Sequence, residues 1–253
     1  MSQPTIIVTG ASQGLGAAIA SMADSHGANV VLTARSASLL EAQVQKISQR
    51  GGNAQAVVAD ISRFEDCQKI VDTALQAFGR IDALINNAGT IEPLAPIVDG
   101  QPDHWAHHMA VNVLGSVMMC QLAIPFLRQT GGRVINVTSH AAEIAIPGAA
   151  AYSTSKAALN RFSKVLAVEE PSITVVLFIP GEVDTAMQGV IREKGRGQTP
   201  DEVHQFFVDL YEQKKLLPPE APALAAVNLA LKAPLEWSGD IIEWDDGRVR
   251  SLV

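Results

Sequence analysis

The 253-residue sequence is poor in residues that carry disulfide or metal chemistry. It has only two cysteines, Cys67 and Cys120, which lie far apart and lack the spacing of metal ligands. This usage predicts two buried thiols in a reducing compartment. Three histidines gather at His104, His107 and His108, but no acidic or cysteine pattern accompanies them, so we predict no metal site.

Positive charge is also scarce. The formal net charge is −7 and no basic block occurs, which disfavours binding to nucleic acid or to an anionic membrane surface. Residues 1–4 lead into an apolar strand without a charged leader or cleavage site. The longest apolar run, Val113–Leu127, is interrupted by Gln121 and Pro125 and predicts a core or subunit-contact helix. We therefore expect a soluble, cytoplasmic protein without a membrane span.

Short Val- and Ile-rich runs alternate with amphipathic segments along the whole chain. Because the runs are apolar throughout, they predict strands buried on both faces, and the alternation predicts a doubly wound parallel sheet of about seven strands with helices on both sides. We expect one α/β domain over residues 1–253, with an irregular insertion at 185–219 where an active-site lid could sit. The expected strands are Thr5–Thr9, Asn29–Thr33, Ala54–Ala59, Asp82–Ile85, Arg133–Thr138, Ile173–Ile179 and Asp240–Glu243, and the expected helices include Gly14–His26, Leu39–Arg50, Arg63–Phe78, Asp103–Leu127 and Ala151–Glu169.

Tyr152 and Lys156 form the most informative pair in the sequence. Positions four apart share a helix face, so the lysine ammonium can favour the phenolate of a tyrosine that otherwise titrates near pH ~10. Ser139 lies upstream and could bind the same substrate oxygen. Tyr211 and Lys215 repeat the spacing, but they lie in a charged run without a matching serine, which indicates a solvated helix face.

The first strand ends in a glycine turn, Thr9–Gly16, with the spacing GxxxGxG. Small residues at the first strand–helix junction let backbone amides approach a pyrophosphate at the helix N-terminus. The second strand ends at Arg35, and no acid occurs between Thr33 and Leu40 to bind a ribose 2′-hydroxyl. A guanidinium at this place can pair with a 2′-phosphate, which favours NADP(H). The alternative is an exposed charge just past a strand end.

Several further motifs follow in order. Asp60-Ile61 comes after the third strand and Asn86-Asn87-Ala88-Gly89 after the fourth; Asn112 lies on the long helix, and Pro180–Thr185 comes after the sixth strand. With the glycine turn, Ser139 and Tyr152-xxx-Lys156, this ordered set resembles the short-chain dehydrogenase/reductases over nearly the whole chain. Within this family, the sequence most resembles the small carbonyl reductases and the sepiapterin or benzil reductases.

The resemblance implies a single Rossmann-type domain, and it implies a role for each residue that matches a family motif. Tyr152 would be the general acid of carbonyl reduction or the base of the reverse reaction, Lys156 would lower its pKa and bind the nicotinamide ribose, and Ser139 would bind the substrate oxygen. Asn112 would hold a water that links Lys156 to solvent. NADP(H) would contact Gly10, Ser12, Gln13, Gly14, Leu15, Gly16, Arg35, Asp60, Ile61, Asn87, Ala88, Gly89, Tyr152, Lys156, Pro180, Gly181, Val183 and Thr185.

Two departures from the family pattern stand out. Gln13 replaces a basic residue common in NADP-preferring relatives, so recognition of the phosphate rests on Arg35, and the connection Val168–Ser172 is short. Mostly apolar positions are expected to face the substrate, which favours a hydrophobic ketone or diketone over a sugar. They are Leu94, His140, Ile144, Ile146, Glu182, Met187 and Val190.

The predicted function is NADPH-dependent reduction of a ketone or diketone. Two alternatives remain open: an NADP-dependent secondary-alcohol dehydrogenase, and a non-catalytic NADP-binding sensor or scaffold. By family resemblance, the partners are a small carbonyl or alcohol substrate and further copies of the chain, as a homodimer or homotetramer joined through the helices at Asp103–Leu127 and Ala151–Glu169.

Overall fold

A parallel sheet runs through the centre of the computed structural model, which describes residues 3–252. Within these residues seven strands pair side by side in the order β3-β2-β1-β4-β5-β6-β7, and each pair is parallel. The order reverses between β1 and β4, where ligands of doubly wound sheets bind. The predicted fold class, including the seventh strand, is confirmed. The strands are β1 Thr5–Thr9, β2 Asn29–Ala34, β3 Ala54–Val58, β4 Ala83–Asn86, β5 Arg133–Val137, β6 Thr174–Ile179 and β7 Ile241–Glu243.

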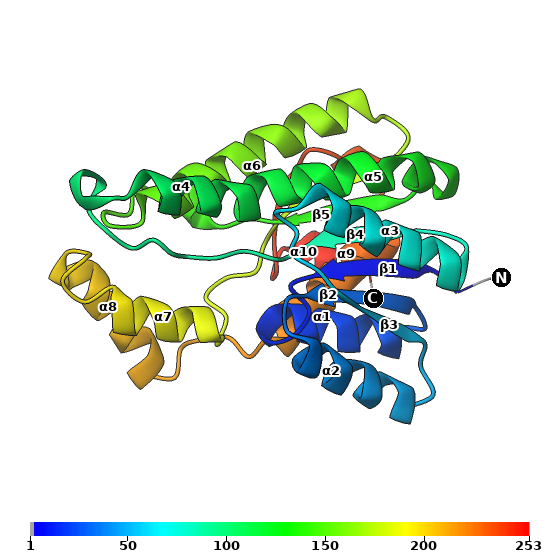
Figure 1. The fold of residues 1–253 in the computed structure, drawn as a ribbon, viewed down its shortest axis with the longest axis horizontal. Helices are drawn as coiled ribbons and strands as arrows, with labels where there is room; N and C mark the ends of the chain where they lie inside the picture. The colour runs from blue at the N-terminus through cyan, green and yellow to red at the C-terminus, as the bar shows by residue number, and fades with distance from the viewer. Residues whose placement is uncertain (1–2, 253) are drawn as a thin grey trace.

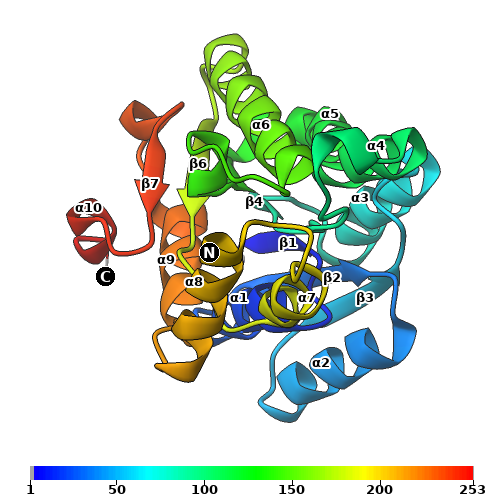
Figure 2. The ribbon, with the colours of Figure 1, turned by 90° about the vertical axis from the view of Figure 1, so that its left-hand side faces the viewer.

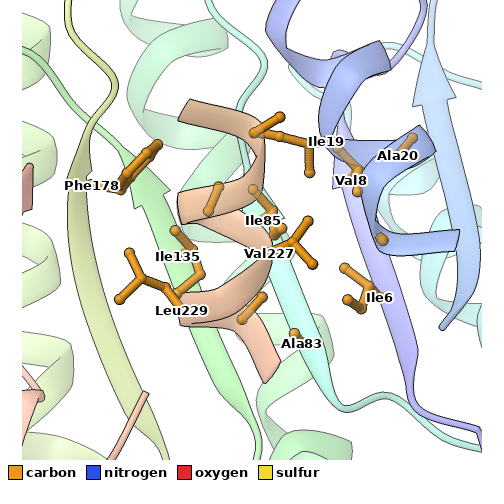
Figure 3. Packing of buried hydrophobic residues seen from close by; sticks show 14 of the residues in the cluster. Ile6, Val8, Ile19, Ala20, Ala83, Ile85, Ile135, Phe178, Val227 and Leu229 are labelled. Carbon is orange, nitrogen blue, oxygen red and sulfur yellow. The ribbon is translucent and has the colours of Figure 1, made fainter. Parts of the chain in front are cut away.

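Helices cover both faces of the sheet (Figure 1). Successive side chains of a strand point to opposite faces, so Ile6 and Val8 of β1 enter one core and Ile7 enters the other. Figure 3 shows the first core, in which Val227 and Leu229 pack over β1, β4 and β5. That face carries α1 Gly14–Ser25, α2 Ala37–Gln49, α9 Glu220–Lys232 and α10 Gly247–Arg250, and the other carries α3 Phe64–Phe78, α5 Gly115–Thr130 and α6 Ala150–Glu169.

Helix α9 is a core element that the sequence analysis did not identify. Its residues from Ala225 to Ala230 are buried without a break, and it packs against α1, β4 and β5. A helix enclosed on most sides has no polar stripe, and the amphipathic period that marks the other helices is therefore weak.

The segment predicted as one helix over Asp103–Leu127 consists of three consecutive parts. Helix α4 (Pro102–Met109) leads into a π-helical segment, η2 (Ala110–Leu114), and then into α5. By length and composition alone this stretch, Pro102–Thr130, could cross a membrane, with a mean hydropathy of 1.7. However, 50% of that window is buried inside the protein, where α5 packs against α3, β4 and β5. The stretch is thus a core helix of the domain.

The region expected to be irregular, 185–219, contains two helices, α7 (Ala186–Lys194) and α8 (Asp201–Glu212). They follow β6 and stand beyond the carboxyl ends of the strands, towards the viewer in Figure 2. The glycines and prolines that suggested irregular structure lie mostly at the ends of these helices. Short 3-10 turns complete the described chain: η1 Ile97–Asp99, η3 His140–Ala142 and η4 Leu235–Trp237.

Candidate active site

Tyr152 and Lys156 lie on the first turns of α6, next to the end of β5. The Ser139 side chain lies close enough to the Tyr152 hydroxyl for hydrogen bonding to lower the phenol pKa. Lys156 is buried and its Nζ lies 5.6 Å from the centroid of the Tyr152 ring. The same Nζ donates a hydrogen bond of 2.8 Å to the carbonyl oxygen of Val137. The three predicted residues therefore form one group at the carboxyl edge of the sheet.

The pKa values of this group differ from the sequence-based expectation. Burial raises the pKa of Tyr152, and the Ser139 hydrogen bond acts in the opposite direction without cancelling it. Burial also lowers the pKa of Lys156 to about 8. The expected lowering of the phenol pKa by the lysine is not found, because Nζ lies over the ring and donates to Val137. Tyr152 is consequently a protonated acid at neutral pH.

Buried polar side chains hold α6 on the sheet. Asn86 Nδ2 donates to Asn136 Oδ1 at 2.8 Å, and Asn136 Nδ2 donates to Ser163 Oγ at 2.8 Å. Thr138 Oγ1 donates to Asn160 Oδ1 at 2.5 Å. Buried polar groups bonded in this way hold a helix and a sheet in one relative position, because a shift of the helix along the sheet would leave these groups without hydrogen-bond partners. These bonds set the place of Tyr152 and Lys156, and only Asn86 had been singled out from the sequence.

Asn112 lies in the π-helical segment, and its amide serves the neighbouring loop. Its Oδ1 accepts from the Thr90 amide and its Nδ2 donates to the Thr90 carbonyl, both at 2.8 Å. Nδ2 also lies 2.9 Å from His108 Nε2 and 3.2 Å from Ser155 Oγ. Both hydrogens of Nδ2 therefore have partners, whereas Oδ1 keeps a second lone pair. A water held by Asn112 would donate to Oδ1 or bind the main chain.

The glycine turn fits closely against the segment after β4. Asn87 Nδ2 donates to the carbonyls of Thr9 at 2.9 Å and Gly10 at 3.3 Å. Gly10 has a φ of +67°, and a Cβ on Gly16 would lie 2.2 Å from the Gly10 oxygen. Only glycine fits both places. The turn therefore packs tightly against residues 87–88, and it does not cover the backbone N–H groups at the N-terminus of α1.

The start of α1 has the properties of a phosphate site. Its N-cap residue, Gln13, makes no side-chain capping bond, and no acidic residue lies in the first turn. The free backbone N–H groups and the positive end of the helix dipole therefore face outward. A Cβ on Gly14 would lie 3.1 Å from Thr185 Cγ2, so the segment after β6 closes the other side of this cradle. A dinucleotide pyrophosphate fits such a cradle.

Arg35 and Asp60 lie together at the ends of β2 and β3. Arg35 is exposed, and within residues 3–252 its side chain makes no ion pair or hydrogen bond. Burial tends to raise the pKa of Asp60, but hydrogen bonds from the Ser62 amide and hydroxyl, aided by the charge of Arg35, lower it overall. Asp60 Oδ1 accepts these bonds at 3.0 and 2.7 Å, and the buried Ile61 follows it. The Arg35 guanidinium remains available to an anion.

The segment after β6 is shaped by a glycine and a short bridge. Gly181 has a φ of +75°, and a Cβ there would lie 2.8 Å from Leu217. Val183 is buried and forms a β-bridge with Leu217, which leads into α9. Thr185 is the N-cap of α7 but makes no side-chain capping bond, so its hydroxyl is free to contact a ligand.

An apolar cluster adjoins the Tyr152 ring. Four of the predicted substrate positions, Leu94, Ile146, Met187 and Val190, belong to it. It also contains residues that the sequence analysis missed: Ile91, Ala149, Ile191 and Phe207. A cavity of about 730 Å³ shares Ile146 with the cluster. It is lined mainly by apolar residues of 96–97 and 145–150, and its polar lining residues are Ser153, Thr154, Gln198 and Thr199. The chemistry on this side of Tyr152 suits an apolar group.

The other predicted substrate positions lie outside this cluster. Ile144 is 57% exposed, and Glu182 is exposed as well. His140 Nε2 lies 3.1 Å from Glu243 Oε1 at the end of β7. These three residues do not belong to the apolar cluster that contacts Tyr152.

The second tyrosine–lysine pair has a different environment, as expected. Tyr211 lies on α8 and is 53% exposed. Its ring carries the guanidinium of Arg192, which lies 4.0 Å from the ring centroid. No serine equivalent to Ser139 contacts it among the described residues, and it serves the packing of α7 on α8.

Other functional residues were hidden in the sequence. His108 and Ser155 are completely buried beside Asn112 and Tyr152. The histidine had been considered only as a metal ligand, and residues 3–252 contain no group of three metal-ligating side chains. A usable signal was its position one turn before Asn112, on the same helix face. Both predicted thiols, Cys67 and Cys120, are buried, and burial raises their pKa values to about 11 and about 12.

Comparisons with known proteins agree with this geometry. The family model described as short chain dehydrogenase matches residues 4–196. A benzil reductase of Saccharomyces cerevisiae that forms (S)-benzoin is 32% identical over 259 residues, covering 96% of this chain and 97% of its own. The crystal structure of another short-chain dehydrogenase/reductase of that yeast superposes with a TM-score of 0.94 at 32% identity and covers 99% of both chains.

A third comparison concerns the cofactor. An alcohol dehydrogenase of Thermococcus sibiricus, solved with 5-hydroxy-NADP, has a TM-score of 0.81 at 25% identity, with 96% of both chains covered. Members of the matched family use NAD(H) or NADP(H), and the cradle at α1 fits the pyrophosphate of either.

Proposed function

The chain belongs to the short-chain dehydrogenase family, and on that basis we propose that it is a carbonyl reductase that reduces a hydrophobic ketone or diketone with NADPH. The observation that carries this proposal is the position of the Tyr152 hydroxyl, beside Ser139 and against an apolar cluster, where burial raises the phenol pKa. Reduction of a ketone needs a proton donor at the carbonyl oxygen, whereas oxidation of an alcohol by a dehydrogenase needs a base. The raised pKa of Tyr152 favours the first role at neutral pH.

The chain's own residues would divide the chemistry as follows. The bound nicotinamide supplies the hydride. Ser139 donates to the carbonyl oxygen and stabilises the charge that develops there, and Tyr152 gives its proton to the same oxygen. Lys156, with a pKa of about 8, is mostly charged at neutral pH and would bind the hydroxyl groups of the nicotinamide ribose. The apolar cluster excludes water and binds the substituents of the ketone.

The choice of NADPH is supported by Arg35. The residue lies one position past the end of β2 and has no ion-pair partner within residues 3–252. A ribose 2′-phosphate at this place would come within reach of its guanidinium. The absence of an acid between Thr33 and Leu40 removes the usual partner of an NAD ribose. The similarity to a benzil reductase supports a diketone as the first substrate to test.

The test follows NADPH absorbance with benzil, other aromatic diketones, quinones and aldehydes. We expect turnover, and we expect Tyr152→Phe to lower kcat/KM by about 100- to 10,000-fold, the usual contribution of a positioned acid. The matched control is Tyr211→Phe, which alters the other tyrosine that has a lysine four residues on. We expect it to leave kcat/KM unchanged.

The same assay separates the alternatives. Turnover that survives Tyr152→Phe would refute the mechanism. Faster oxidation of a secondary alcohol with NADP than reduction of any ketone at neutral pH would favour the dehydrogenase. Tight NADPH binding without turnover of any compound would favour a sensor or scaffold.

A further inference from the structure

His108 is the one histidine of the described chain that is completely buried. It lies on α4, one turn before Asn112, and its ring meets the Tyr152 ring edge to face at 6.2 Å and 81°. A histidine that served only to fill space would cost free energy, because both ring nitrogens would need partners. Here both nitrogens have partners, and the partners come from three different elements.

The hydrogen bonds determine the protonation state of the ring. Nδ1 lies 2.6 Å from the Glu92 carbonyl oxygen, which can only accept, so Nδ1 carries the proton. The Asn112 amide is oriented by Thr90, whose N–H needs Oδ1, and its Nδ2 therefore faces His108 Nε2 at 2.9 Å. Nε2 must accept this bond and is unprotonated. The ring is thus the neutral Nδ1–H tautomer.

Ser155 links this ring to the catalytic helix. Its Oγ lies 3.0 Å from His108 Nε2 and 2.8 Å from the main-chain oxygen of Tyr152, and its one hydroxyl proton can be donated to either acceptor. Asn112 Nδ2 also reaches Ser155 Oγ, at 3.2 Å. The imidazole therefore joins the loop after β4, the π-helical segment and the turn of α6 that carries Tyr152.

We propose that His108 is a positioning residue for carbonyl reduction, and that its neutral Nδ1–H tautomer holds Asn112 and Tyr152 in their working arrangement. This inference rests on the function proposed above. Loss of the acceptor at Nε2 frees the Asn112 amide from one side and removes the contact that sets Ser155. A small displacement of Tyr152 then follows, and displacements near 1 Å lower catalytic rates strongly.

Protonation of His108 would break the same arrangement. A proton on Nε2 could be accepted by Ser155 Oγ but would remove the acceptor of the Asn112 N–H, and the new charge would be repelled by the ammonium of Lys156 on α6. His107 on the same helix adds to this repulsion, while the Glu92 carboxylate is engaged with Lys194 of α7 at 2.6 Å. Burial, the largest influence, lowers the pKa of His108, and the arrangement therefore stays intact at neutral pH and is lost only in acid.

Two substitutions separate the two ring nitrogens. His108→Gln places an amide oxygen near the position of Nε2 and keeps an acceptor for Asn112, whereas His108→Asn keeps a donor for the Glu92 carbonyl and leaves Asn112 without its acceptor. We expect His108→Asn to lower kcat by about 10- to 100-fold with little change in KM. His108→Gln should retain most of kcat and lose the acid limb of the pH profile. His104→Gln, an exposed change on the same helix, is the matched control and should resemble the unsubstituted protein.

A second measurement needs no turnover. Ring ¹⁵N NMR of the protein, with the His108 signals identified by their loss in His108→Gln, should show the neutral Nδ1–H form at pH 7.5. Thermal unfolding of each variant checks that the fold is kept. A protein that reduces no carbonyl compound would refute the proposed function, while the NMR experiment would still decide the tautomer.

Three results would overturn the inference. The first is an Nε2–H or a doubly protonated ring at pH 7.5. The second is equal kcat in the Asn and Gln variants. The third is loss of activity that merely follows loss of thermal stability, with an unchanged pH profile, because a purely structural role predicts that result.

Discussion

At Tyr152, burial and the Ser139 hydrogen bond act on the pKa in opposite directions, and burial has the larger effect. The neighbouring Lys156 is itself desolvated, which lowers its pKa to about 8. Each side chain is therefore held closer to its neutral form than it would be in water. This balance keeps a proton on the phenol and places the titration of the lysine just above neutral pH.

The first residue-scale prediction concerns pH. The kcat/KM for NADPH, which reports groups of the free enzyme, should be level between neutral pH and about pH 8 and fall by about tenfold per pH unit above it. The cause is loss of the Lys156 proton, since a lowered lysine pKa means that the charge disappears as pH rises through about 8. Initial rates of benzil reduction from pH 6 to about 10 measure this. A level profile up to the top of that range would contradict the assignment.

The second residue-scale prediction concerns the cofactor. Arg35→Asp should lower kcat/KM for NADPH relative to NADH by about 10- to 100-fold, because a charged hydrogen bond to the 2′-phosphate is lost and an acid takes its place. Steady-state kinetics with both cofactors give the ratio. Arg196→Asp, an exposed change of the same charge, should leave the ratio as it is. A preference of the unsubstituted protein for NADH would remove the role of Arg35.

At the scale of elements, the site is built from tight junctions between a few segments. The turn from β1 to α1 is pressed against residues 87–88, and the segment after β6 touches it through Thr185 and Gly14. Helix α6 is attached to β5 by bonds from Asn136 and Thr138. Each junction leaves no space for a shift, so the cofactor cradle and the proton donor keep a fixed separation.

The element-scale prediction concerns Gly16. In Gly16→Ala the new Cβ would lie 2.2 Å from the Gly10 oxygen and 2.5 Å from Asn87 Nδ2, which forces the turn apart. We expect a loss of stability of about 1–3 kcal/mol, as for other overpacked sites, and weaker NADPH binding. Denaturant unfolding and cofactor titration measure the two effects. Gly247→Ala has no heavy atom within 4 Å of its new Cβ and should change neither.

For the whole molecule, the outer helices of one face carry exposed apolar side chains. Val165 and Val168 on α6 are 47% and 81% exposed, and Leu114 before α5 is 54% exposed. Such side chains on neighbouring helices suit contact with another protein surface. We propose that the chain pairs with itself through α5 and α6.

The whole-molecule prediction follows from that surface. Light scattering should give a mass of two or four times the 26.8 kDa of the chain. Val165→Glu combined with Val168→Glu should shift the mass towards that of one chain, because charge would be buried without a partner. Leu39→Glu on α2, 43% exposed on the opposite face, should not. A single-chain mass at micromolar concentration for the unsubstituted protein would contradict the proposal.

The sequence by itself determined the sheet, the order of its motifs and the identity of the Tyr152, Lys156 and Ser139 group. Those features are local: apolar runs specify buried strands, glycines specify a tight turn, and a spacing of four places two side chains on one helix face. It also separated Tyr152 from Tyr211, because only one of them follows a serine at the end of a strand.

Only the tertiary structure decided how these residues behave. The direction of the Tyr152 pKa depends on how deeply α6 is buried, which no local pattern records. Helix α9 lacks an amphipathic period because it is enclosed by other elements. Helices α7 and α8 form within a segment rich in glycine and proline because they pack against each other. The role of His108 depends on a loop and two helices distant in sequence, and its partners meet only when α4 and α6 pack together at the carboxyl edge of the sheet.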